Sequence, residues 1–384
     1  MGATVIGVGE RPIEEMDPEL RGWLLHYERI GNVTDVDALE WAVRQAQSRL
    51  WIDRLEATVE AHTLAAAEVR ERCAIPGTSV RTAYLCRDKP AMKEALRQAG
   101  VPTAQSAAAS SAAQVRDFAH HTGYPLILKP RAGAGASGTV RVDSDAELDA
   151  ALSQLGASGA DSIAVEEFVE GHEAFYDTLC IDGQPVYDFI SHYYPNVLEA
   201  MRTRWISPQF IATNRIDSSP AYAEVRELGQ RVIEALGIGT TATHMEWFFG
   251  PRGLRFSEIG CRPPGVRAWD LYAAGNDIDI YREWANAIVH GHVDRPLSRR
   301  RAAGLIALRP DRDGYITYYD GIDDIQQRFG EHVLDAYLPP PGTPTQPVEA
   351  GYMGNAWVRM VHEDYDTLRH MLDQVGETVH VHAA

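Results

Sequence analysis

The sequence predicts an α/β protein in which strand-like segments alternate with well-punctuated helices. Apolar runs at 125–131, 163–169 and 242–249 have the length and composition of buried strands. Amphipathic segments lie between such runs, and they begin with capping residues and end at glycine, as from Asp88 to Gly100. At 384 residues the chain is too long for one compact core, so we expect two or three subdomains.

The N-terminal part is expected to open with a strand at residues 4–8, and the lone G-x-G pattern there is interpreted as a tight turn. Residues 39–72 carry helical spacing, and a break follows at 75–78. Asp182-Gly183 predicts a hairpin. Further helices are expected at 88–100, 111–123, 144–155, 219–237 and in a basic stretch ending near 301. Further strands are expected at 138–142 and 254–259. A last α+β segment is expected to contain a loop at 339–344.

Composition excludes several classes of function. The net charge of -18 argues against binding to nucleic acid or to an anionic membrane. The four cysteines form no C-x-x-C pair, which argues against a zinc site or a disulfide scaffold and fits a reducing compartment. The sequence shows no basic leader and no apolar run of membrane-spanning length, so we expect a cytoplasmic protein.

Two lysines stand where an anion would explain them. Lys129 ends an apolar strand, where a lysine needs an anion or water, and the glycine-rich segment 131–138 follows it. Such a loop lets backbone N–H groups approach phosphate oxygens, although the lysine precedes the glycines and the pattern is therefore no P-loop. Lys89 begins the helix capped by Asp88, against the helix dipole. The alternatives are an exposed hairpin tip and a solvated lysine.

Acidic residues form two further groups. The segment 165–173 places glutamates at the end of a strand, which indicates either a nucleotide hinge or a plain acidic loop. Glu246 and Glu258 interrupt two apolar strands joined by a short connection. On one face they would repel each other unless a cation or proton lay between them, and oxygen ligands suit Mg²⁺. Arg262 follows, with a planar fork that suits a phosphoryl group. The alternatives are that one glutamate faces solvent and that the arginine forms a surface ion pair.

In this order the motifs resemble the ATP-grasp superfamily. The resemblance runs from about residue 76 to 275, and the segment from Gly304 looks like the extra subdomain of the carboxylate–amine ligase branch, which includes L-amino-acid ligases. It implies an ATP-grasp fold with an N-terminal Rossmann-like subdomain (1–86), an ATP-grasp domain (87–290) with a mobile lid (about 121–176) and a catalytic body, and a C-terminal α+β subdomain (291–384) packed on that body.

The resemblance also implies residue roles. Lys89 and Lys129 would hold ATP phosphates, Lys129 and Arg262 would act in catalysis, and Glu246 and Glu258 would bind one or two Mg²⁺ ions, with Mn²⁺ as a substitute. The family's usual Asn two residues after the second glutamate is replaced here by Gly260, which puts the number of metal ions in doubt. Other nucleotide-binding residues would be Gly135, Ser137, Gly138, Glu166, Glu167, Phe168, Val169 and Glu173, with the backbone of Glu167 and Val169 facing adenine and the Glu173 carboxylate facing ribose.

The implied reaction is ATP-dependent joining of a carboxylate to an amine through an acyl phosphate, with release of ADP and phosphate. The substrates would be small molecules, expected to be amino acids, and a homodimer is allowed. Another reaction on the same fold (carboxylation or phosphorylation of a small molecule) and an ATP-binding module without catalysis are the alternatives. Candidates for holding the substrate are Arg202, Arg204, Arg215, Arg267 and His192.

Two short motifs receive simpler interpretations. Ala91-Met92-Lys93 resembles a biotin attachment sequence, but it lies within a capped helix rather than in a hairpin. Cys261 beside Arg262 has the setting of a reactive thiol, and a small residue packed in a turn is the simpler interpretation.

Overall fold

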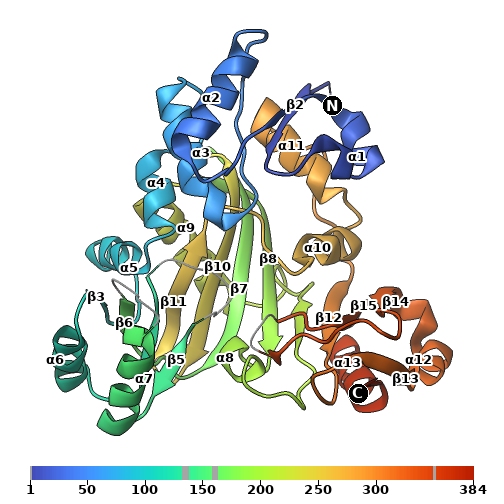
Figure 1. The fold of residues 1–384 in the computed structure, drawn as a ribbon. Helices are drawn as coiled ribbons and strands as arrows, with labels where there is room; N and C mark the ends of the chain where they lie inside the picture. The colour runs from blue at the N-terminus through green and yellow to red at the C-terminus, as the bar shows by residue number, and fades with distance from the viewer. Residues whose placement is uncertain (1, 132–137, 158–162, 349–351) are drawn as a thin grey trace.

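A computed structural model of the chain describes residues 2–131, 138–157, 163–348 and 352–384, and it has the predicted α/β class. A large antiparallel sheet forms its centre (Figure 1). In spatial order its strands are β11 (Gly253–Gly260), β10 (Thr241–Gly250), β7 (His172–Ile181), β8 (Gln184–Tyr194), β9 (Gln209–Ala212), β12 (Ala302–Leu308), β15 (Ala356–His362) and β14 (Val333–Tyr337).

Both faces of this sheet are covered because its central strands are apolar on both sides. On β7, Ala174 and Tyr176 pack on one face, in a cluster shared with α9 (Ala221–Leu236). Phe175 and Leu179 pack on the other face, against α10 (Ala268–Asn276) and α11 (Ile280–His290). The predicted hairpin is present, since β7 and β8 are joined by Asp182-Gly183, both with positive φ.

A smaller sheet lies at one end of the large one, at the lower left of Figure 1, and we call it the lid sheet. Its strands, in spatial order, are β3 (Ser106–Ala109), β6 (Ile163–Glu167), β4 (Leu126–Pro130) and β5 (Val140–Val142), and its helices are α6 (Ala112–Thr122) and α7 (Asp145–Ala157). The chain enters it beside β11, where the Phe256 N–H donates to the Pro102 carbonyl at 2.8 Å. This contact brings β4 toward the edge of the large sheet.

The N-terminal part lies at the top of Figure 1 and carries a parallel pair of strands, β1 (Val5–Gly9) and β2 (Leu24–Arg29), joined through α1 (Pro18–Trp23). The expectation of continuous helix over 39–72 is wrong. Helix α2 (Val36–Gln47) and helix α3 (Thr63–Arg72) are separated by a largely irregular segment. Its Arg54 Nε donates to the Ile288 carbonyl at 2.8 Å, so tertiary contacts outweigh local helix propensity there.

Two short helices lead from the N-terminal part to the lid sheet, α4 (Val80–Leu85) and α5 (Lys89–Gln98). A four-residue helix, α8 (Val197–Ala200), follows β8. The chain beyond α11 adds α12 (Ile322–Phe329), α13 (Tyr365–Thr378) and the paired strands β13 (Ile316–Asp320) and β16 (His380–Ala383).

The C-terminal part extends the large sheet, because β12 pairs with β9 and is followed by β15 and β14. The predicted helical stretch ends earlier than expected: α11 stops at Gly291, which has a left-handed φ of 71°. The proline-rich segment 339–344 is a loop, as predicted. Among the residues described, no helix combines the length and the apolar character needed to cross a bilayer.

Candidate functional site

The two glutamates that interrupt the apolar strands lie opposite each other. In the antiparallel pair β10–β11, Glu246 is the direct register partner of Glu258. Direct partners project to the same face of a sheet, and this face also carries Phe175 of β7, the register partner of Glu246. The ladder shifts register just after Glu246. The two glutamates that interrupt apolar strands in the sequence are therefore neighbouring carboxylates in the fold.

Two lysines from different elements converge on Glu258. Lys89 is the first residue of α5, whose N-cap Asp88 accepts from the Ala91 N–H at 3.0 Å. Its Nζ lies 3.2 Å from Glu258 Oε2, and Nζ of Lys129, near the end of β4, lies 3.9 Å from the same oxygen. Burial raises the pKa of Glu258, but both lysines outweigh burial and lower the pKa below its usual range.

Glu166 of β6 joins a second pair of lysines inside the protein. Lys93 of α5 and Lys129 both contact Glu166 Oε2, at 2.5 and 2.9 Å. Burial raises the pKa of Glu166, but the two lysines lower it to about 2, whereas burial lowers the pKa of Lys93 to about 8. The other oxygen, Glu166 Oε1, is buried without a hydrogen-bond partner in the protein. An amino group of a ligand would satisfy that oxygen.

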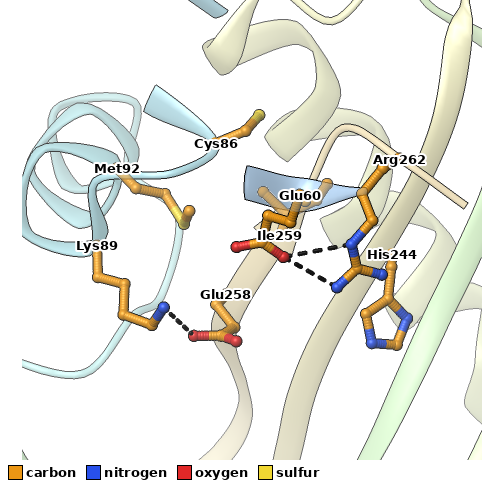
Figure 2. A pocket seen from close by; sticks show the side chains of 9 residues that line it. Glu60, Cys86, Lys89, Met92, His244, Glu258, Ile259 and Arg262 are labelled. Atoms are coloured by element: carbon orange, nitrogen blue, oxygen red, sulfur yellow. Dashed lines mark hydrogen bonds and ion pairs between the residues drawn. The ribbon is translucent and has the colours of Figure 1, made fainter. Parts of the chain in front are cut away.

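Arg262 lies at the far side of a small pocket that Figure 2 shows from close by. Its Nη2 donates to Glu60 Oε2 at 2.9 Å and its Nε to the same oxygen at 3.2 Å. Glu60 precedes α3, so the N-terminal part supplies the partner of this arginine. A Cβ at Gly260 would lie 3.6 Å from Glu60 Oε2, so this position also faces the pocket. The pocket is lined by Glu60, Cys86, Lys89, Met92, His244, Glu258, Ile259, Gly260 and Arg262.

His244 adds a positive charge that sequence reasoning missed. Its Nδ1 lies 2.6 Å from Asp177 Oδ1, and its Nε2 lies 3.7 Å from Glu246 Oε1. Tyr272 OH donates to the other oxygen of Asp177, which is fully buried. Burial lowers the pKa of His244, but Asp177 outweighs burial and raises it to about 9, so the ring is an imidazolium at neutral pH. The signal in the sequence was alternation, since His244 and Glu246 share a face of one strand.

Other residues missed from the sequence are Glu60, Lys93 and Asp177. Each is a partner of a predicted or neighbouring site residue, and each comes from a segment distant in the chain. Only Lys93 carried a local signal, because it lies four residues after Lys89 in α5. Residues four apart share one face of a helix, and both lysines are buried.

Glu173, expected to contact ribose, has a partner inside the protein. It is buried, and its Oε2 accepts from the N–H of Val197, the first residue of α8, at 2.7 Å. Burial and the charge of Glu246 raise the pKa of Glu173 to about 8. Because it already serves a helix N-terminus inside the protein, this geometry argues against the expected contact with ribose.

The hinge segment is partly engaged by the protein itself. The Glu167 N–H donates to the Gln105 carbonyl and the Phe168 N–H to the Pro125 carbonyl, both at 3.0 Å. The N–H of Glu167 is therefore used inside the protein, and the backbone of Val169 remains a candidate for adenine. Gly138, at the end of the glycine-rich segment, has φ 70°, and a Cβ there would lie 3.1 Å from Pro130. Gly135 and Ser137 lie outside the described residues.

The substrate candidates separate into two groups. Arg204 pairs with Asp313, and Arg215 pairs with Asp364 and Asp366, so both serve ion pairs to the C-terminal part. His192 is the register partner of Ala174, which places it on the sheet face opposite to Glu246. These three geometries argue against the expected substrate contacts.

Arg202 and Arg267 remain candidates for the substrate. Arg202 Nη2 donates to the Thr139 carbonyl at 3.4 Å, beside the end of the glycine-rich segment. Arg267, in a left-handed conformation just before α10, lies over the ring of Trp357 at 5.0 Å.

The donor set fits a nucleotide with a hard divalent cation. Glu173, Glu246 and Glu258 gather carboxylates on one face, and burial together with the charge of Glu246 raises the pKa of Glu173. Oxygen donors of this kind match Mg²⁺, which completes its shell with water and phosphate. No group of three or more acidic, histidine or cysteine side chains arranged for a metal occurs among the residues that the structure describes. A bound ion would therefore rely on the glutamate pair and on the nucleotide.

Comparisons with known proteins identify a domain family and relatives of this chain. The ATP-grasp domain family matches residues 94–274. The chain is 25% identical over 368 residues to an L-arginine-specific L-amino acid ligase of Bacillus subtilis, covering 94% of this chain and 87% of that protein.

Two solved structures share the fold. The L-amino acid ligase from Bacillus licheniformis superposes with a TM-score of 0.79 at 20% identity, covering 100% of this chain and 93% of that chain. The N5-carboxyaminoimidazole synthetase from Staphylococcus aureus, complexed with ADP, gives a TM-score of 0.68 at 15% identity, covering 98% of this chain and 91% of that chain. The family match identifies an ATP-grasp domain at residues 94–274, and the whole chain shares the fold of these two enzymes.

Proposed function

We propose that the protein is a carboxylate–amine ligase, which joins two small molecules at the expense of ATP through an acyl phosphate. The observation that carries the proposal is the convergence on one sheet face of three cations, Lys89, Lys129 and Arg262, with the paired glutamates 246 and 258. Such a set handles charge on phosphoryl groups and requires no enzyme nucleophile.

Each cation has a carboxylate partner that it would exchange for a ligand. Lys89 and Lys129 would leave Glu258 for phosphate oxygens of ATP, and Glu166 would keep Lys129 oriented through its 2.9 Å contact. Glu246 and Glu258 would hold Mg²⁺, which when bound offsets charge on the phosphoryl group. The unpaired Glu166 Oε1 would accept a hydrogen bond from the adenine amino group.

Arg262 and His244 are the cations nearest the expected reacting end. Arg262 would exchange Glu60 for oxygens of the acyl phosphate, using its planar fork of donors. The imidazolium of His244, fixed by Asp177, would attract the substrate carboxylate before transfer and stabilise negative charge during transfer. An amine then displaces phosphate from the activated acyl group. The amino-acid ligase activities of the two relatives above support amino acids as substrates.

The proposal is tested by incubating the protein with MgATP and pools of amino acids while ADP, phosphate and products are measured. We expect ADP and phosphate to appear together with a dipeptide or another amide. The Lys129→Ala variant should lower kcat/KM by about two orders of magnitude, close to 3 kcal/mol. A carboxylated or phosphorylated product without an amide would favour another ATP-grasp reaction, and no ADP release with any pool would favour a binding module.

A further inference from the structure

Two cysteine thiols meet beside the candidate site, and the proposed ligase mechanism uses neither. Cys86 and Cys261 are 175 positions apart in the chain, yet their Sγ atoms lie 2.8 Å apart and form a hydrogen bond. Both are free thiols, buried in the apolar cluster under β10 and β11. The Sγ–Sγ distance in a disulfide is about 2.05 Å, so a small movement would bring these two atoms to bonding distance.

The thiol pair lies between the segment that carries Lys89 and the segment that carries Arg262. Cys86 caps the C-terminus of α4 and stands three residues before Lys89. Cys261 lies between Gly260 and Arg262, at the end of β11. Cys86 also lines the pocket, above Met92 and Lys89 in the view of Figure 2. A small oxidant that enters the pocket therefore meets Cys86, whose Sγ lies 2.8 Å from that of Cys261.

We propose that Cys86 and Cys261 form a reversible disulfide that lowers turnover under oxidising conditions. With hydrogen peroxide as oxidant, one thiol attacks a peroxide oxygen, which gives a sulfenic acid and releases water. The second thiol then attacks the sulfenic sulfur, forms the S–S bond and releases a second water. Two thiols are oxidised by two electrons and one peroxide is reduced to two waters, so atoms and electrons balance. A dithiol reductant reverses the reaction.

The surroundings of Cys86 favour the protonated form of its thiol. The hydrogen bond with Cys261 and burial raise the pKa of Cys86 well above its usual value. Among the described residues, Cys73 and Cys180, the other free cysteines, form no thiol–thiol hydrogen bond.

The disulfide would lower turnover by hindering the release of Lys89 and Arg262 from their carboxylate partners. Lys89 must leave Glu258, and Arg262 must leave Glu60, before either can bind a ligand. A covalent link between Cys86 and Cys261 would restrain the backbone on either side of both cations, because it fixes the start of α5 against the end of β11. The ATP-free arrangement of the site would thus be favoured over the ligand-bound one.

The test treats the full-length protein with hydrogen peroxide and maps its cysteines by mass spectrometry after alkylation. We expect two of the four thiols to disappear, a cross-linked peptide pair containing Cys86 and Cys261, and full reversal by dithiothreitol. Prior addition of MgATP should slow cross-linking, because nucleotide would cover the pocket. Amino-acid-dependent ADP release should fall by about tenfold or more in the oxidised protein and return on reduction.

Variants separate this pair from other sites of oxidation. Each protein is compared with its own reduced form: Cys86→Ala and Cys261→Ala should lose the response to peroxide, while Cys73→Ala, a buried thiol remote from the pair, should keep it. Cys86→Ser serves if an alanine variant does not fold. The proposal is overturned if peroxide yields no Cys86–Cys261 peptide, or if the peptide forms while turnover is unchanged.

The activity measurement rests on the proposed ligase function, whereas the peptide map does not. If no ligation is detected with any substrate, ADP binding by the reduced and the oxidised protein replaces turnover, with weaker binding expected after oxidation. Failure of the ligase proposal and failure of the thiol proposal are thus read from different measurements.

Discussion

At the scale of single residues, Glu258 connects the parts of the site. It accepts Lys89 and Lys129 from two different elements and lies opposite Glu246. Its negative charge thus compensates two buried cations when no ligand is bound, and it would serve the metal ion when nucleotide is bound. A substitution that removes the charge of Glu258 but keeps its volume therefore tests the electrostatic role of this side chain.

The Glu258→Gln variant should lose turnover by about a hundredfold or more while keeping the fold, because an amide retains shape but cannot compensate a cation. Steady-state ADP release and circular dichroism measure the two effects. Glu331→Gln, at a largely exposed position, is the matched control and should behave like the unmodified protein. Turnover within a few fold of normal for the Glu258 variant would contradict the assignment.

His244 predicts a specific dependence of stability on pH. Its folded-state pKa of about 9 lies above its ordinary value of 6.5, so the protonated ring stabilises the fold fully below about pH 6.5 and the contribution disappears as pH rises through about 9. The gap corresponds to roughly 3 kcal/mol. The difference in unfolding free energy between unmodified protein and His244→Gln should therefore shrink between about pH 6 and pH 10.

Denaturant titrations of both proteins at several pH values measure this difference. The contributions of other groups that titrate in the same range are common to both proteins and cancel in the difference. His380→Gln, at an exposed position, should show a small difference that does not vary with pH. A His244 difference that stays constant over the whole range would show that its charge does not stabilise the fold.

At the scale of elements, the start of α5 places Lys89 against β11. The carboxylate of Asp88 accepts from the Ala91 N–H and from Arg131 Nε, so one side chain caps α5 and also holds the residue that begins the glycine-rich segment. The cap fixes the first turn of the helix, and the first turn carries the lysine.

Asp88→Ala should destabilise the protein by about 1–2 kcal/mol and raise the KM for ATP severalfold, because it removes the cap and the ion pair together. Asp88→Asn keeps a capping oxygen and should lose less stability. Urea unfolding and ATP titrations measure both effects. Asp35→Ala removes the cap of α2, remote from the site, and should cost stability with little change in KM. Equal KM values for both alanine variants would count against a role of the α5 cap in ATP binding.

At the scale of the whole molecule, the large sheet continues through the predicted boundary near residue 290. Strand β12 pairs with β9 on one side and with β15 on the other, and Leu305 shares an apolar cluster with Phe175 and Phe210. The C-terminal part therefore completes the sheet that carries the site, in addition to packing on it.

A chain that ends at His290 should fail to fold cooperatively, because it leaves the β9 edge unpaired and uncovers the apolar cluster around Phe210. Thermal unfolding and size-exclusion chromatography of the fragment and of the full chain test this prediction. A soluble fragment with a sharp transition would show that residues 1–290 are an independent unit.

The sequence predicted those parts of the site that depend on local pattern. Lys129 and the glutamates 246 and 258 were recognisable because a charge within an apolar strand needs a partner. Asp177 and Glu60 were not, since their importance arises from contacts with His244 and Arg262 across the fold. The irregular segment within 39–72, where a helix was predicted, also makes a contact distant in the chain, with α11, that local pattern does not reveal.

The contact between Glu60 and Arg262 joins the N-terminal part to the candidate site. Residue 60 belongs to the N-terminal part, which lies outside the matched domain, yet its carboxylate pairs with Arg262 of the candidate site. The 202 positions between them make the pair invisible to any local comparison of motifs. Proteins of this fold that share every residue within 94–274 can therefore differ in whether that arginine is already paired with a carboxylate, and so in how readily it binds an anion.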